Sequence, residues 1–340
     1  MNFKEEKLNR ILSFYNIDVK STETLNEDND VFKIIDNTDN CYFLKIYGNN
    51  NYDIIPGENI YHTYEQIQLE SEILLLLSDS VLKTAVPFRN KNCDFVTTLA
   101  PDADGESMFA TITSFVDGFV KNHKDALTAE TAYIAGVSAA QLHLESKKRL
   151  LPLAIRRPHK RQDYIRKIQK RLLQGIEIGT VTAVQYEIIS QCCDVIIDCM
   201  TQLDKDPENN VGLVHTDIRN TNIVYNQNHG TLIDFSRSVY SYYLYDLAEM
   251  CLHGDFGGAS PELQNAILRG YHSVKPLSKY DIFAIQALFA MFILTIMAEC
   301  IESKGLPWIE SIAKGFTNEF YSSLVSGKAY FDSSVYENIF

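Results

Sequence analysis

The sequence predicts an α+β fold with a small N-terminal lobe, built on an antiparallel sheet, and a large, mostly helical C-terminal lobe. Short β-rich runs separated by polar turns fill the first third of the chain, and apolar residues at helical spacing dominate after Gly118. The length of 340 residues is sufficient for two hydrophobic cores. We therefore expect an N-terminal lobe over residues 1–113, a hinge over residues 114–118 and a C-terminal lobe over residues 119–340.

In the N-terminal lobe, helices are expected where apolar residues recur three or four positions apart, and strands where β-branched and aromatic residues form short runs. The helices cover residues 5–15 and 66–78. The strands cover residues 31–35 and 41–47, which form a hairpin around the turn DNTDN, and the segments DFVTTLA and MFATITSFV.

In the C-terminal lobe, helical periodicity is nearly continuous. Helices are expected over residues 129–146, 160–174, 183–203, 242–254, 262–271, 280–303 and 307–326. A β-hairpin interrupts them, with strands over residues 223–225 and 231–233 around the polar turn NQNHG. Two lobes of this kind leave a cleft, which is a common place for a nucleotide to bind.

The most apolar segment, residues 282–298, contains only Gln286 and Thr295 as polar residues. A helix that spans a membrane needs about 20 apolar residues, usually with basic or aromatic flanks. This run is shorter, and it is bounded by Asp281 and Glu299. We interpret it as a buried helix of the helical lobe and expect no membrane partner.

The composition bounds the partners and the location. The chain carries 31 Lys and Arg against 44 Asp and Glu, a net charge of −13, which argues against nucleic acid and fits a cationic substrate. The seven cysteines include no CxxC pair and no zinc-like spacing, which favours reduced thiols in a cytoplasmic protein. The N-terminal segment MNFKEEKLNR lacks the apolar stretch of a signal peptide.

The segment LVHTDIRNTNIVYNQNHGTLIDF, residues 213–235, is the most informative part of the chain. If its turn centres on Asn228, Asn222 and Asp234 face each other at the open end of the hairpin. The preceding loop carries His215 and Asp217. A carboxamide and a carboxylate at one point, beside a second carboxylate, suit Mg²⁺ held on a nucleotide and a base for an incoming hydroxyl.

The spacing H-x-D-x-x-x-x-N followed by D-F is typical of enzymes that transfer a phosphoryl group. In this interpretation Asp217 orients the acceptor hydroxyl and takes its proton, and Asn222 with Asp234 holds Mg²⁺. His215 braces the catalytic loop. The alternative is an ordinary polar turn with Asp234 at a solvated strand end, which would require the whole pattern to match by chance.

A lysine and a glutamate in the N-terminal lobe fit the same chemistry. Strand alternation places Phe43, Lys45 and Tyr47 on one face of their strand. Glu70 falls in the middle of the apolar face of the helix over residues 66–78, where a carboxylate needs a cationic partner. A Lys45–Glu70 pair would hold the lysine over the α- and β-phosphates. The alternative for Lys45 is a solvated residue on the outer face of the sheet.

The glycine-rich loop expected over the phosphates is missing, since no glycine precedes Gly48. The candidate turn is LNEDNDVF, residues 25–32, in which Glu27, Asp28 and Asp30 would repel a phosphate. Either this loop stays away from the phosphates and acts through Asn29, or nucleotide binding is weak.

With these motifs, the chain resembles the aminoglycoside phosphotransferase/choline kinase superfamily, which has a bilobal, protein-kinase-like fold. The similar segments extend over most of the chain: NDVFKI, YFLKIY, TSFVDG, AGVSAAQLH, VHTDIRNTN, LIDFSRS and YLYDLA. The segment DFSRSVYSYYLYDLA is similar to homoserine-kinase-like and stress-response-kinase-like branches. Thr216 departs from the usual glycine before the catalytic aspartate, and Ser236 departs from the common Asp or Gly.

This resemblance implies that ATP is the phosphoryl donor. Lys45 would contact its phosphates, and Asp246 would tie the start of a helix to the catalytic loop. The adenine would form hydrogen bonds with backbone groups of the hinge, from Thr113 through Ser114 and Phe115 to Val116.

The function expected is therefore an ATP- and Mg²⁺-dependent phosphotransferase acting on a hydroxyl of a small, amine-bearing molecule. An antibiotic-inactivating kinase and a metabolite kinase of the homoserine or choline type both remain open. A protein Ser/Thr kinase is one alternative, but its activation segment of about twenty residues would not fit in the twelve-residue step from Asp234 to Asp246. A non-catalytic nucleotide-binding module with a kinase fold is the other.

Three further residues each have two interpretations. Arg219 and Arg237 either stabilise the charge of a transferring phosphate or form structural ion pairs, for instance with Asp246 or Glu249. His143 is interpreted as a packed histidine at a helix end rather than a catalyst.

Overall fold

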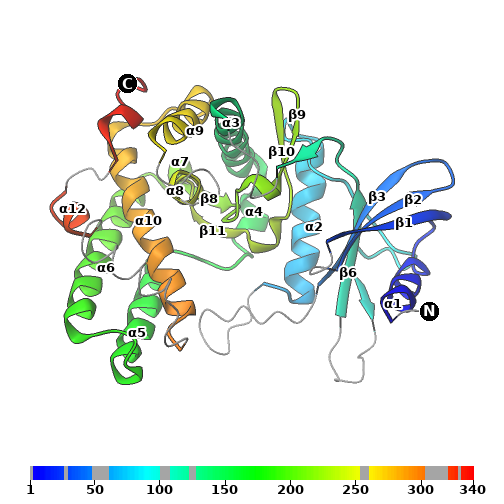
Figure 1. The fold of residues 1–340 in the computed structure, drawn as a ribbon, viewed down its shortest axis with the longest axis horizontal. Coiled ribbons are helices and arrows are strands. Elements are labelled where there is room, and N and C mark those ends of the chain that lie inside the picture. Colours follow the sequence, from blue (N-terminus) through cyan, green and yellow to red (C-terminus); the bar gives the residue numbers. More distant parts are fainter. Residues whose placement is uncertain are drawn as a thin grey trace. The chain divides into compact units, whose positions relative to one another are not determined.

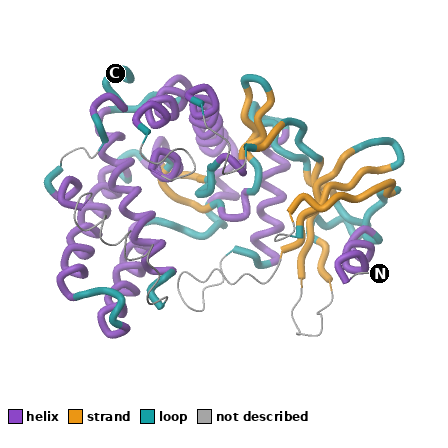
Figure 2. Tube along the Cα trace, viewed as in Figure 1, coloured by secondary structure: helices purple, strands orange, loops and turns teal. Residues whose placement is uncertain are grey.

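The computed structural model describes residues 3–26, 30–47, 61–99, 108–121, 128–252, 260–302, 321–327 and 331–340. The chain forms two compact units, of which the first contains residues 1–52 and 59–118 and the second contains residues 53–58 and 119–340. Strands dominate the first unit and helices the second (Figures 1 and 2). The predicted α+β class is confirmed.

The first unit is built on a six-stranded antiparallel sheet in which β1, β2, β3, β6 and β4 are neighbours in that order and β5 also pairs with β6. Its strands are β1 (Val19–Asn26), β2 (Val31–Asp36), β3 (Cys41–Tyr47), β4 (Pro87–Phe88), β5 (Thr97–Leu99) and β6 (Met108–Ser114). Its helices are α1 (Phe3–Leu12) and α2 (Tyr64–Ser78).

Different helices cover the two faces of this sheet. On one face, Leu8 of α1 joins a hydrophobic core that includes Leu44 of β3. On the other face, Ile67 of α2 packs with Tyr47. Because side chains alternate along a strand, Lys45 shares the α2 face with Tyr47.

The second unit contains helices and several short strands. Its helices are α3 (Ala129–Glu145), α4 (Leu151–Ala154), α5 (Gln162–Ile178), α6 (Ala183–Leu203), α7 (Pro207–Asn210), α8 (Leu244–Leu252), α9 (Pro261–Val274), α10 (Lys279–Glu299) and α12 (Tyr321–Val325). A π-helical turn (Ser146–Leu150) joins α3 to α4. The strands are β7 (Phe119–Val120), β8 (Val211–Val214), β9 (Ile223–Asn226), β10 (His229–Leu232) and β11 (Val239–Tyr242).

Hydroxyl side chains start four of the long helices. Thr63, Thr128, Thr182 and Ser278 each accept a hydrogen bond from a backbone N–H in the first turn of α2, α3, α6 and α10 respectively. Such caps satisfy donors that have no partner within the helix, and each typically contributes about 1 kcal/mol.

Helices α3 and α9 lie side by side in the second unit and cross at two glycines (Figure 1). A Cβ atom on Gly136 would lie 2.1 Å from the carbonyl oxygen of Ile267. A Cβ atom on Gly270 would lie 2.1 Å from the carbonyl oxygen of Tyr133. No side chain fits at such a distance, so this helix pair packs backbone against backbone.

Helix α10 contains the apolar segment recognised in the sequence. Among the described residues it is the one helix long and apolar enough to cross a membrane, but 67% of its apolar window is buried inside the protein. It packs against α5, α6 and α8. Its polar residues are also paired, because Thr295 donates to the carbonyl of Met291 and Gln286 to that of Ile282. These contacts agree with a core helix.

The predicted hairpin of the second unit is present, but its register is one residue away from the expected one. The turn contains two residues, of which Gln227 has a φ of 50°, and β9 and β10 pair with Leu232 opposite Ile223. The carbonyl of Asn222 consequently accepts from the N–H of Ile233 at 3.0 Å. Asn222 and Asp234 are therefore adjacent across the hairpin but not directly opposed.

Two further differences concern secondary structure. Strand β1, with the polar sequence VKSTETLN, was not expected, because its β character comes from pairing with β2 rather than from an apolar run. The helix expected over residues 307–326 falls mostly outside the described residues, and α12 covers its described end.

Candidate active site

The residues of the central motif lie on one continuous path of the second unit. Strand β8 is buried along its whole length and pairs with β11. The chain leaves β8 through His215 and Asp217 and enters a 3₁₀ turn (Asn220–Asn222) that leads into β9. After β10, Asp234 precedes a second 3₁₀ turn (Phe235–Arg237) that leads into β11. Both ends of the motif are thus attached to the same pair of strands.

Asp246, in the first turn of α8, anchors the loop that carries Asp217. Its Oδ2 accepts the backbone N–H of His215 at 2.9 Å, and its Oδ1 accepts that of Thr216 at 2.7 Å. Nε2 of His143 lies 2.9 Å from the same Oδ2. The side chain of Asp246 is fully buried. The expectation that this aspartate ties a helix start to the catalytic loop agrees with these contacts.

His143 is the packed histidine that the sequence indicates. Its Nδ1 lies 2.8 Å from the hydroxyl of Tyr271, and its ring stacks on that of Tyr243 with centroids 4.7 Å apart. Burial lowers the pKa of His143 from its usual value, so the ring is neutral at pH 7. A neutral ring that accepts from Tyr271 at Nδ1 donates from Nε2 to Asp246.

Thr216 adopts a left-handed backbone conformation, with a φ of 57°. A β-branched residue is rarely found in this region, which explains why glycine is usual here. The threonine hydroxyl donates to the carbonyl of Arg237 at 2.7 Å. This bond joins the loop before β9 to the turn after β10 and is not available to glycine.

His215 holds the same two segments together. Its Nε2 lies 3.0 Å from the carbonyl oxygen of Ile233, and its ring centroid lies 4.6 Å from that of Phe235. The side chain is fully buried. These are the contacts of a residue that positions the loop.

Asp217 is surrounded by polar groups despite being largely buried. Its carboxylate accepts from the Nδ2 of Asn222 at 2.8 Å and forms an ion pair with Nε of Arg219 at 3.0 Å. Burial raises the pKa of Asp217, while the charges of Arg219, His215 and Arg237 oppose the increase. A more basic carboxylate in a fixed orientation is suited to accepting a proton.

Asn222 and Asp234 are both held by neighbouring groups. The Nδ2 of Asn222 donates to the carbonyl as well as to the carboxylate of Asp217, which leaves its Oδ1 as the oxygen suited to a cation. Asp234 has a φ of 62°, and its Oδ1 accepts from the hydroxyl of Ser236 at 2.6 Å. Ser236, the second departure from the family pattern, therefore orients this carboxylate.

Arg157 supports the turn after Asp234 and was not identified in the sequence. Its guanidinium donates to the backbone carbonyls of Phe235, Ser236 and Ser238 at 3.2, 2.7 and 2.8 Å. The residue is only 2% exposed. A basic residue within RRPHKR gave no signal of burial, because only the fold brings residues 235–238 next to it.

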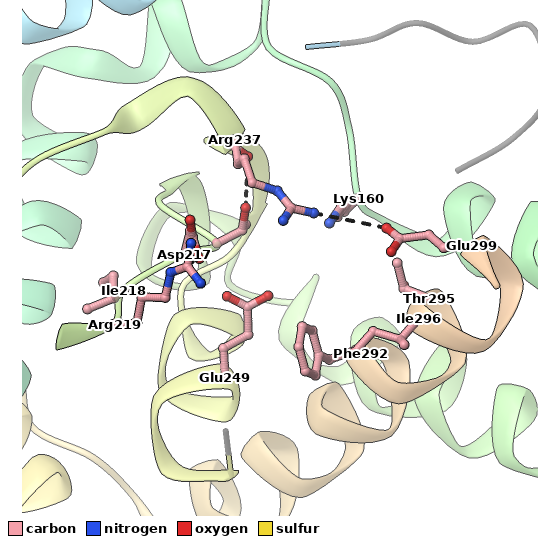
Figure 3. Close-up of a pocket in the computed structure, with 11 residues that line it drawn as sticks. Lys160, Asp217, Ile218, Arg219, Arg237, Glu249, Phe292, Thr295, Ile296 and Glu299 are labelled. Atoms are coloured by element: carbon pink, nitrogen blue, oxygen red, sulfur yellow. Dashed lines mark hydrogen bonds and ion pairs between the residues drawn. The ribbon is translucent and has the colours of Figure 1, made fainter. Parts of the chain in front are cut away.

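A pocket of about 240 Å³ opens beside Asp217 within the second unit. Figure 3 shows that the catalytic loop, α8 and α10 contribute its walls. Its lining comprises Lys160, Thr216, Asp217, Ile218, Arg219, Arg237, Glu249, Phe292, Thr295, Ile296 and Glu299. The candidate base therefore faces a space where a small molecule could bind.

The two arginines that flank the motif both form ion pairs, but not with the partners considered above. Arg219 pairs with Asp217, and Nη2 of Arg237 lies 4.0 Å from Oε1 of Glu299 (Figure 3). Both guanidinium groups remain partly exposed and line the pocket.

The donor set fits a divalent cation held jointly with a ligand. Within the described part of the chain, no group of three or more His, Cys, Asp and Glu side chains could hold a metal ion alone. Mg²⁺ commonly binds through one or two carboxylates together with substrate phosphates and water. Asn222 and Asp234 supply oxygen atoms of the kind that such a site needs.

In the first unit, Lys45 and Glu70 are connected through Tyr47. The ammonium of Lys45 lies 5.0 Å from the ring centroid of Tyr47. The hydroxyl of Tyr47 donates to Oε2 of Glu70 at 3.1 Å. Glu70 is 4% exposed and lies on the inner face of α2. The tyrosine was expected on this face of β3 but not as a link between the two charges.

The proposed hinge begins at the end of β6. The N–H of Ser114 donates to the carbonyl of Val86, and that of Phe115 to the carbonyl of Cys41. Among the described residues, none accepts a hydrogen bond from the backbone N–H of Val116. Thr113 is buried and pairs within the sheet. Asn29, the candidate of the phosphate loop, lies outside the described residues.

Comparison with known proteins identifies the class. The model of the phosphotransferase enzyme family matches residues 24–283. The chain therefore belongs to this family, and the superfamily resemblance seen in its motifs is confirmed. This family consists of phosphotransferases, as the motifs predict. Among curated proteins, none matches the sequence.

Solved structures show the same fold at low sequence identity. A microcompartment-associated aminopropanol kinase aligns with a TM-score of 0.72 and 19% identity, covering 95% of this chain and 98% of the other. An amicoumacin kinase in complex with AMP-PNP, Ca²⁺ and Ami aligns with a TM-score of 0.62 and 17% identity, covering 97% and 96%. An ethanolamine kinase from Plasmodium vivax aligns with a TM-score of 0.55 and 15% identity, covering 90% of this chain and 81% of the other.

The segment between Asp234 and α8 bears on the protein kinase alternative. It is described throughout and consists of the 3₁₀ turn, β11 and a short connection to Leu244. No residues remain for an activation segment of about twenty residues. A small-molecule acceptor is therefore favoured over a protein.

Proposed function

We propose that the protein transfers the γ-phosphoryl group of ATP to a hydroxyl of a small, amine-bearing molecule, with Mg²⁺ bound by Asn222 and Asp234. The observation that carries this proposal is the position of Asp217. Its carboxylate lines a pocket of molecular size and is oriented by Asn222 and Arg219.

In the proposed reaction, the acceptor hydroxyl is oriented by Asp217 and attacks the γ-phosphorus. A new bond forms between the acceptor oxygen and phosphorus, and the bond from phosphorus to the β,γ-bridging oxygen breaks. The hydroxyl proton passes to the carboxylate of Asp217, and ADP leaves with the bonding electron pair. Catalysis rests on positioning and on charge stabilisation, as in other phosphoryl transfers.

The residues around Asp217 keep this geometry. Asn222 fixes the carboxylate, and Arg219 and Arg237 lie at the pocket where they would stabilise negative charge on the transferred group. When bound, Mg²⁺ would neutralise charge on the β- and γ-phosphates. The hydrogen bonds of Ser236 to Asp234 and of Arg157 to the following turn would hold the anionic ligand in place.

Nucleotide binding would involve the first unit. Lys45 would contact the phosphates, with Tyr47 and Glu70 restricting its position. In the segment 113–116, the N–H of Val116 is the donor best suited to the adenine, because the N–H groups of Ser114 and Phe115 already donate within the protein. Asn29 remains the candidate in the phosphate loop.

The acceptor class includes both antibiotics and metabolites. The structural neighbours are named for aminopropanol, ethanolamine, amicoumacin and spectinomycin. Aminopropanol and ethanolamine are amino alcohols, and the net charge of −13 of this chain also favours a cationic acceptor.

The proposal is tested by screening purified protein with Mg²⁺-ATP against hydroxylated amines and antibiotics, with ADP release as the readout. We expect at least one acceptor to stimulate ADP release, and Asp217→Asn to lower kcat by about 10²–10⁴-fold without preventing nucleotide binding. Asp198→Asn, at an exposed position of α6, is the matched control. If no acceptor raises ADP release above the Asp217→Asn background, the catalytic proposal fails and a nucleotide-binding module is favoured.

A further inference from the structure

The acceptor pocket contains a buried carboxylate whose surroundings in the protein are incomplete. Glu249 lies one turn after Asp246 on α8 and is 6% exposed. Asp246 accepts hydrogen bonds from two backbone N–H groups and the ring of His143. Among the residues that the structure describes, none forms a hydrogen bond or an ion pair with Glu249.

The other charged side chains of the pocket do not provide a direct partner. Arg219 pairs with Asp217, and Arg237 approaches Glu299. Lys160 is 4% exposed, and its ammonium lies 5.5 Å from the ring centroid of Tyr245. The positive charge of Lys160 favours the charged form of Glu249, but these two described residues form no ion pair.

Burial is the dominant influence on this carboxyl group. It raises the pKa of Glu249 well above the usual value, and the negative charges of Asp246 and Asp217 act in the same direction. The positive charges of Lys160 and Arg237 oppose the increase without cancelling it. A buried carboxylate in this state is stabilised by a ligand that brings a positive charge and hydrogen-bond donors.

The position of Glu249 indicates where such a ligand would bind. In Figure 3 its carboxylate projects from α8 into the pocket, between Asp217 on the catalytic loop and Phe292 on α10. Phe292 and Ile296 offer apolar contacts for a short carbon chain. The volume of about 240 Å³ is below the roughly 300–1,000 Å³ typical of pockets for drug-sized ligands.

We propose that Glu249 selects the acceptor by binding the ammonium group of a short amino alcohol whose hydroxyl is presented to Asp217. This inference rests on the proposed phosphotransfer to a hydroxyl. Among the described residues, Glu249 is the one carboxylate of the lining without an ion pair, which matches a single amine. The small volume favours a short chain over a multi-ring amino sugar.

Activity measurements with matched acceptors test the selection. Ethanolamine and 1-amino-2-propanol are compared with ethylene glycol and 1,2-propanediol, which have the same chain length and no amine. We expect wild-type kcat/KM to be about 10–100-fold higher for the amines, as for hydrogen bonds to charged groups. In Glu249→Gln this preference should fall to near one, through KM more than kcat, and in the control Glu187→Gln, exposed on α6, it should be retained.

Thermal unfolding without nucleotide gives a second readout. We expect each amino alcohol to raise the Tm of the wild type but not that of Glu249→Gln. Without ligand, Glu249→Gln should have the same Tm as the wild type or a higher one, because it breaks no hydrogen bond or ion pair of the described residues. A clearly lower Tm would identify Glu249 as a structural group and overturn the inference.

The outcomes separate this inference from the proposed function. If diols and amino alcohols are phosphorylated equally well, or if Glu249→Gln keeps the preference for the amine, Glu249 does not select the acceptor although phosphotransfer stands. If no acceptor supports ADP release, the proposed function fails. In that case a Tm increase by amino alcohols that Glu249→Gln loses would still support ammonium binding at Glu249.

Discussion

Asp246 and Glu249 lie one turn apart on α8, and both are buried, yet the two regions around them are built differently. Beneath the catalytic loop, Asp246 is saturated by hydrogen bonds from His143, His215 and Thr216. At the acceptor pocket, Glu249 has no such donor among the described residues. The same type of side chain on the same helix thus meets two opposite environments.

This difference shows how a buried carboxylate can be assigned to structure or to recognition. A carboxylate whose oxygens are all engaged by protein donors contributes to stability, since removing it leaves those donors without partners. A carboxylate without protein donors carries a desolvation penalty, which is offset by protonation or by a cationic ligand. Asp246 therefore belongs to a loop held by hydrogen bonds within the protein, whereas Glu249 belongs to a pocket wall that the acceptor would complete in the inference proposed above.

The largest effect on stability is expected when the hydrogen bonds of Asp246 are disrupted. Asp246→Asn should lower the free energy of unfolding by about 3 kcal/mol or more, because one oxygen is replaced by an amide donor facing backbone donors. Chemical denaturation measures this change. The exposed Asp198→Asn should change stability by less than about 0.5 kcal/mol. A similar small change for Asp246→Asn would show that its hydrogen bonds do not hold the loop.

A smaller effect is expected at Arg157, which supports the turn after Asp234. Arg157→Met should reduce stability by about 2 kcal/mol and weaken Mg²⁺-dependent nucleotide binding, since three backbone carbonyls lose their donor. Arg156→Met changes the neighbouring, exposed arginine and should have little effect on either quantity. Denaturation and nucleotide titration with and without Mg²⁺ distinguish the two. Unchanged binding in Arg157→Met would separate this arginine from the cation site.

The smallest effect is expected at Thr216. Thr216→Gly relieves a left-handed backbone strain of about 1 kcal/mol but loses the hydrogen bond to the carbonyl of Arg237, so stability should change by less than about 1 kcal/mol. Thr216→Val keeps the strain and loses the bond, and it should be about 1 kcal/mol less stable than Thr216→Gly. Comparison of the denaturation midpoints of Thr216→Val and the wild type measures the contribution of the hydroxyl, and comparison of the two variants measures the strain. Equal midpoints for Thr216→Val and the wild type would mean that this bond contributes nothing.

The sequence predicted the candidate functional residues of the site better than the residues that hold them in position. The spacing from His215 to Asp234 predicted the loop, the candidate base and both candidate cation ligands as one group, because these residues are close in the chain and their distances are set by one hairpin. The α+β class followed from periodicity for the same reason. Even within this segment, the register was wrong by one residue, since a two-residue turn replaced the longer turn that was assumed.

The residues that support the site depend on contacts between distant parts of the chain. The bonds of Arg157 to residues 235–238 and of His143 to Asp246 join segments about 80 and 103 positions apart. No local pattern marks such pairs. The sequence suggested Glu249 only as a possible ion-pair partner of an arginine, and only the fold shows that its side chain enters the pocket.

The glycine crossing of α3 and α9 has a consequence far from its own position. His143 on α3 and Tyr271 on α9 can share a hydrogen bond only while the two helix axes stay at their present separation. The absence of side chains at Gly136 and Gly270 therefore allows the position of His143 that orients Asp246. Asp246 in turn holds the loop before β9. A larger residue at Gly136 or Gly270 would therefore disturb the loop that carries Asp217, although neither glycine lines the pocket.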